Sequence, residues 1–131
     1  MLVLSAEVEA HAGRGAAALE ILDTARQISI DTGLRVYDSE IFRIRGDILL
    51  RLSLANEAEA EACYADALTM SRQQSCRALE LRTVASIARL RRDQNRSKEA
   101  RDLLSPVYEG FTEGFDVPDL KAAKAILAEL S

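Results

Sequence analysis

The sequence predicts an all-α protein of about seven helices. Apolar residues recur every three or four positions along most of the 131-residue chain, and no segment alternates at period two for long enough to form a strand. The chain contains two prolines and six glycines, too few for the frequent turns of a β-sandwich or barrel. Its 48% hydrophobic and 29% charged residues are typical of a chain that folds.

Glycines delimit the first two predicted helices. Apolar residues at helical spacing indicate a first helix that stops before Gly13: Val3, Leu4 and Val8. A second helix is expected from about residue 16 until Gly33, because a glycine readily adopts the left-handed conformation that ends a helix. A third is expected over about residues 36–53, with apolar side chains on more than one side.

Polar residues mark the starts of the next helices. Asn56 and Glu59 have the spacing of an N-cap and its capping-box carboxylate, which predicts a fourth helix that runs to about residue 74. A fifth helix is expected over about residues 77–93. Ser97 is the predicted N-cap of a sixth helix, which should loosen near Pro106 because proline lacks a backbone donor.

The C-terminal segment is expected to close the helical core. Pro118 suits the first turn of a seventh helix. Three aromatic residues before it, Tyr108, Phe111 and Phe115, are expected to cover the end of the core. The predicted apolar face of this helix consists of Leu120, Ala123, Leu127 and Leu130.

Part of the chain repeats at an offset of 40 residues. The repeat aligns Gly46 with Ser86, Ala60 with Ala100, Tyr64 with Leu104, and Ala67 with Val107. A looser match at an offset of 42 adds Ala18, Leu22 and Ala25. Small side chains let two helix backbones approach, and the large residue fills the space between neighbouring hairpins. Such hairpins are predicted to stack into one domain.

The set of Gly46, Ala60, Tyr64 and Ala67 resembles the tetratricopeptide repeat, although the period is longer than the usual length of about 34 residues. Phe42 is the nearest candidate for the usual aromatic residue of the first helix. The resemblance implies a right-handed antiparallel helix-hairpin solenoid. Its expected parts are a partial or first repeat (1–34), a second repeat (35–76), a third repeat (77–112) and a capping helix (113–131).

Three runs, 40–50, 79–90 and 111–120, are similar to the C-terminal repeat region of bacterial multidomain regulators. Those proteins carry an adenylate/guanylate cyclase or winged-helix domain, followed by a signalling-type ATPase module. The similarity implies a tail fragment of such a regulator that makes protein–protein or interdomain contacts. The alternative is a small-molecule sensor that regulates the attached ATPase or cyclase.

The sequence contains no catalytic or metal-binding motif that we recognise. Gly13-Arg14-Gly15 lacks the Lys-Ser/Thr pair of a phosphate-binding loop and is interpreted as an interhelical turn. His11 is the only histidine, and no nucleophile near it in sequence completes a catalytic set. Cys63 is expected to be buried and Cys76 exposed, without a CxxC motif. We therefore expect a cytoplasmic protein that is not an enzyme and has no cofactor or metal.

Charge and hydropathy restrict the partners. A net charge of −4 disfavours nucleic acid, and no apolar run is long enough to span a membrane. The basic stretch between Arg89 and Arg101 could dock an acidic partner, but three interleaved acids favour a solvated helix face: Asp93, Glu99 and Asp102.

A concave groove is the predicted binding surface, because the first helix of each hairpin lines the concave side in tetratricopeptide stacks. A mixed surface of this kind suits an extended peptide or a helix. The predicted groove residues are Glu40, Arg43, Asp47, Leu50, Arg51, Glu80, Thr83, Ile87, Leu90 and Arg91. At the N-terminal end, an apolar face with Leu2, Leu4 and Val8 could pair with a second copy to form a homodimer.

Overall fold

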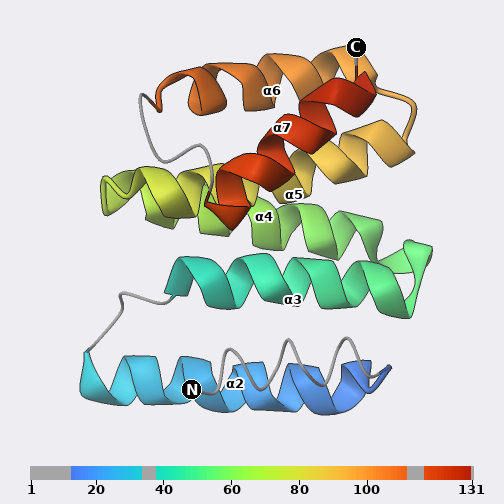
Figure 1. Ribbon diagram of the computed structural model, residues 1–131. Helices are drawn as coiled ribbons and strands as arrows, with labels where there is room; N and C mark the ends of the chain where they lie inside the picture. Colours follow the sequence, from blue (N-terminus) through green and yellow to red (C-terminus); the bar gives the residue numbers. More distant parts are fainter. Residues whose placement is uncertain (1–12, 34–37, 112–116, 131) are drawn as a thin grey trace. The chain divides into compact units, whose positions relative to one another are not determined.

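The computed structural model describes residues 13–33, 38–111 and 117–130 (Figure 1). These ranges contain six α-helices, one short 3-10 helix and no strand, which confirms the all-α class. The first predicted helix, with Val3, Leu4 and Val8, lies outside the described residues. The chain divides into two compact units, residues 1–70 and 71–131, and each is described by itself.

Helix α2 (Gly15–Thr32) ends at the predicted glycine. Gly33 has a φ of 72°, in the left-handed region that side chains rarely adopt. Gly13 also has a positive φ, 83°, in the turn that precedes the helix. The sequence therefore correctly located both ends of this helix.

Helix α3 (Asp38–Leu52) packs on α2 and forms the core of the first unit. The buried residues of this core share one apolar cluster: Ala18, Leu22 and Ala25 from α2, and Ile41, Ile44 and Ile48 from α3. Burial of each large aliphatic side chain contributes about 1.5–3 kcal/mol to the free energy of unfolding. Their helical spacing places these residues on one face of each helix, and the contact between the two faces holds α2 and α3 together.

A buried carboxylate connects the end of α2 to the start of α3. Asp38 is 2% exposed and accepts a 2.6 Å hydrogen bond from Ser29 Oγ. Arg26 Nη1 lies 3.0 Å from Asp38 Oδ2, and the same guanidinium lies 4.8 Å from the centre of the Phe42 ring. The hydrogen bond and the charge partner offset the cost of burying Asp38.

Helix α4 (Glu57–Gln73) follows a short 3-10 helix, η1 (Leu54–Asn56). Asn56 is the last residue of η1 and directly precedes α4, at the position predicted for the N-cap. Its side-chain nitrogen donates a 3.0 Å hydrogen bond to the carbonyl oxygen of Leu49, which ties the start of α4 to the last turns of α3. Ser39 Oγ donates to the Ala67 carbonyl oxygen at 3.0 Å and fixes the other end of the α3–α4 contact.

The second unit contains helix α5 (Arg77–Asp93), which matches the predicted range, and helix α6 (Ser97–Glu109). The assignment of Ser97 as N-cap was wrong, because Ser97 is already helical and Arg96 precedes the helix without a side-chain cap. The backbone turns sharply at Asn95, with a φ of 62°. Helix α6 starts one residue earlier than predicted. Helix α6 also continues through Pro106 to Glu109.

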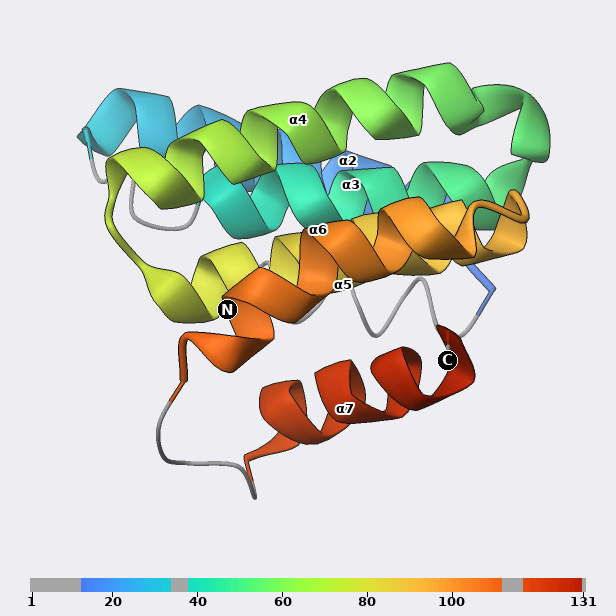
Figure 2. The ribbon, with the colours of Figure 1, turned by 90° about the horizontal axis from the view of Figure 1, so that it is seen from above.

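Helix α7 (Pro118–Leu130) begins with the predicted proline and packs against α5 and α6 (Figure 2). Its buried residues are Leu120, Ala123, Ile126 and Leu130. Leu127 was wrongly predicted for this face and is only half-buried, because adjacent helical residues point about 100° apart.

Two ion pairs hold α7 on α5. Arg82 Nε lies 2.7 Å from Asp119 Oδ2, and Arg92 pairs with Glu129. Both pairs join residues 37 positions apart, so α7 runs parallel to α5. Tyr108 and Phe111 are half-buried near the end of α6, whereas Phe115 lies outside the described residues.

Candidate functional site

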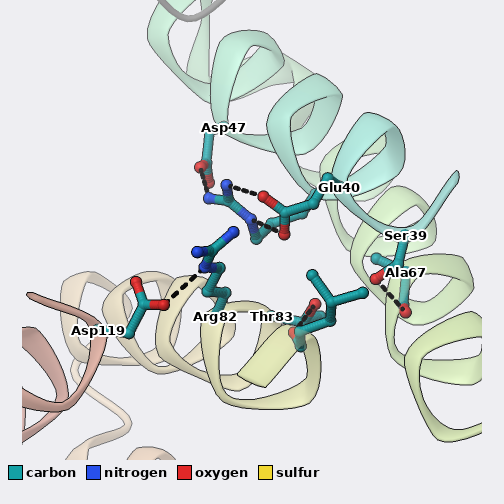
Figure 3. Close-up of polar contacts among 9 residues, drawn as sticks. Ser39, Glu40, Asp47, Ala67, Arg82, Thr83 and Asp119 are labelled. Atoms are coloured by element: carbon teal, nitrogen blue, oxygen red, sulfur yellow. Dashed lines mark hydrogen bonds and ion pairs between the residues drawn. The ribbon is translucent and has the colours of Figure 1, made fainter. Parts of the chain in front are cut away.

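Three of the five first-unit residues of the predicted groove form an ion-pair network on α3: Glu40, Arg43 and Asp47. Arg43 donates two hydrogen bonds to the carboxylate of Glu40, at 3.1 Å from Nε to Oε1 and 2.9 Å from Nη2 to Oε2 (Figure 3). A third nitrogen, Nη1, lies 3.2 Å from Asp47 Oδ2. Three directed hydrogen bonds from one guanidinium fix its orientation and leave Arg43 only 13% exposed.

Tyr64 extends this network to α4. Its hydroxyl donates a 2.5 Å hydrogen bond to the second oxygen of Asp47, and its ring is 1% exposed. Gly46 lies directly against the ring: a Cβ atom at Gly46 would stand 2.6 Å from Tyr64 Cε1. The repeat pattern predicted a close approach at the small position Gly46, and this contact requires the absence of a side chain there. The pattern assigned Tyr64 to the space between neighbouring hairpins, whereas its ring contacts Gly46 within one hairpin.

The second-unit residues of the predicted groove make local contacts. Glu80 Oε2 accepts from Arg72 Nε at 3.0 Å, and Arg91 Nη1 donates to Gln94 Oε1 at 3.0 Å. Thr83 is buried, and its hydroxyl donates to the Leu79 carbonyl oxygen one turn earlier at 3.0 Å (Figure 3).

The ten predicted groove residues differ in exposure. Glu40, Thr83 and Leu90 are buried, so in this structure their side chains are shielded from solvent. The seven that are half-buried or exposed are Arg43, Asp47, Leu50, Arg51, Glu80, Ile87 and Arg91. Within each unit, the partly exposed residues are available to a ligand, whereas the buried three contribute to packing.

Four polar residues that sequence reasoning missed are buried or paired in the first unit: Arg26, Ser29, Asp38 and Ser39. Ser29 lies four residues after Ala25, on the buried face of α2. That spacing was the available signal, since a serine in an apolar stripe usually needs a hydrogen-bond partner. The geometry gives these residues a structural role at the junction of α2 with α3 and of α3 with α4.

Among the described residues, neither cysteine belongs to a cluster of side chains that could hold a metal ion. Cys63 and Cys76 are both half-buried, so Cys63 is less buried, and Cys76 less exposed, than expected. Burial raises the pKa of the Cys63 thiol, although Arg45 partly opposes the rise. No group of three or more His, Cys, Asp or Glu side chains gathers in the described ranges. His11 lies outside them.

Three of the six basic residues in the stretch from Arg89 to Arg101 form ion pairs: Arg91, Arg92 and Arg96. Arg92 Nε lies 3.2 Å from Asp93 Oδ1, and Arg96 pairs with Glu99. Burial lowers the pKa of Arg92, but its hydrogen bonds to Asp93 and Glu129 outweigh that effect and raise the pKa. The local pairing favours the interpretation of this stretch as a solvated helix face.

None of the helices in residues 13–33, 38–111 and 117–130 is long and apolar enough to cross a bilayer. Comparisons of the chain with protein-family models, with curated proteins and with solved structures gave no match.

Proposed function

We propose that this chain is a non-catalytic helical-repeat module that makes protein–protein or interdomain contacts in a bacterial signalling regulator. The observation that carries the proposal is a helix pair that recurs after 40 residues. When 40 is added to its residue numbers, α3 covers residues 78–92, which agrees closely with α5 (Arg77–Asp93). The start of α4 moves to residue 97 by the same shift, and α6 also starts at that residue. Chains built from repeated hairpins commonly function through the extended surface that the hairpins present.

The recurring positions behave alike in each hairpin, which supports a common packing rule. Six of the eight matched residues have at most 2% exposure: Ala60, Tyr64, Ala67, Ser86, Ala100 and Leu104. Gly46 is also buried, whereas Val107 is half-buried. The agreement supports a repeated hairpin, and the resemblance to tetratricopeptide repeats implies that the proposed stack of hairpins is right-handed. The similarity of runs 40–50, 79–90 and 111–120 to regulator tails supports the assignment to a signalling protein.

The proposed ligand is an extended peptide or a helix that contacts α3. Asp47 and Arg43 are held by neighbouring side chains rather than free to rotate, so little side-chain entropy would be lost when a partner binds. Leu50 and Arg51 continue this surface toward the end of the helix, half-buried and exposed respectively. An apolar contact beside fixed charges suits recognition of an amphipathic segment.

Selection from a random peptide library displayed on phage tests the proposal. Peptides enriched on the purified chain would be measured by titration against an Arg51→Glu variant and a matched control, Arg101→Glu, which reverses an exposed arginine on α6. We expect a loss of about tenfold or more in affinity for Arg51→Glu, corresponding to at least about 1.4 kcal/mol, and no change for the control.

Three outcomes would contradict this assignment. The first is the absence of any enriched peptide, and the second is an equal loss of affinity in both variants with unchanged helical circular dichroism. The third is a nucleotide or metabolite that raises the melting temperature in a screen while no peptide binds, which would favour the sensor alternative.

A further inference from the structure

We draw no further inference here: the strongest candidate, the solvent-facing seam that Ala58, Ala62, Ala65 and Thr69 form along α4 between acidic side chains, is a stripe of small residues, and nothing in the described part of the chain shows what covers it.

Discussion

Substitution of Gly46 by alanine should destabilise the chain, against the usual effect of this change in a helix. Alanine is normally favoured over glycine in a helix interior by about 0.5–1 kcal/mol. The new methyl group would stand 2.6 Å from Tyr64 Cε1, so the ring must move by roughly 1 Å to reach ordinary contact. Tyr64 is 1% exposed and its hydroxyl is bonded to Asp47, so the ring has little freedom to move.

Overpacking of this kind costs about 1–3 kcal/mol. After the gain in helix propensity is subtracted, we expect Gly46→Ala to lower the free energy of unfolding by about 1–2 kcal/mol. Gly15 provides the matched control, because its Cβ would stand 2.5 Å from Leu52 Cδ2. Leu52 is 48% exposed and can rotate away, so Gly15→Ala should be neutral or slightly stabilising.

The second hairpin indicates how the clash could be relieved. In that hairpin, Ser86 stands at the position of Gly46 and Leu104 at the position of Tyr64. Serine is larger than glycine, and leucine is smaller than tyrosine. The double variant Gly46→Ser/Tyr64→Leu should therefore lose less stability than the sum of its single changes, with a coupling of about 1 kcal/mol.

Urea unfolding followed by far-ultraviolet circular dichroism measures these changes, and tyrosine fluorescence checks that the transition is two-state. The reasoning predicts a lower midpoint for Gly46→Ala and an unchanged or higher midpoint for Gly15→Ala. A midpoint that rises equally in both variants would refute it, because Gly46 would then have room for a side chain.

Three further predictions rest on backbone conformation, on burial and on the pKa of a thiol. Ser75 has a φ of 52°, so Ser75→Gly should raise the melting temperature by relieving about 0.5–1 kcal/mol of backbone strain. Asn95→Gly should raise the melting temperature less. A lower melting temperature for Ser75→Gly would contradict this prediction. Ile126→Ala should lower the free energy of unfolding in urea by about 2–4 kcal/mol, and substitution of the half-buried Leu127 by alanine should lower it by roughly 1 kcal/mol. A larger loss for Leu127→Ala would instead support the sequence-based prediction that Leu127 lies on the buried face of α7. Burial raises the pKa of Cys63, so iodoacetamide should alkylate this thiol more slowly in the folded chain than in urea at about pH 8, as read by mass spectrometry. Because the folded pKa of Cys63 is raised, the contribution of its neutral thiol to the free energy of unfolding should be complete below the unfolded thiol pKa. This contribution should be lost as pH rises through the folded pKa. Equal alkylation rates in the folded chain and in urea would contradict the raised pKa.

Local sequence signals located most helix ends because backbone chemistry decides them. Gly33 takes a left-handed conformation, and Pro118 occupies a first turn where its missing donor costs nothing. The prediction of Ser97 as N-cap was wrong because the hydrogen bonds at the end of the preceding helix, α5, were not visible in the residues around Ser97. The amide of Arg96 donates to the Arg91 carbonyl oxygen at 2.8 Å, so the end of α5 determines where α6 begins.

Side-chain exposure was harder to predict from the sequence than the packing positions. Periodicity identifies the residues of one helix face, but it does not show how deeply a neighbouring helix covers that face. Glu40 therefore looked like a surface carboxylate, whereas it is 5% exposed and held by Arg43. Gly46 and Tyr64 were predictable because close helix approach requires a particular combination of sizes.

Nuclear magnetic resonance of the isotopically labelled chain tests the central packing claim most directly. We predict nuclear Overhauser effects between the Gly46 α protons and the Tyr64 ring, with at least one α proton shifted upfield by the ring current. Gly46 α protons at random-coil shifts, with no Overhauser effect to Tyr64, would contradict the hairpin on which the proposed function rests.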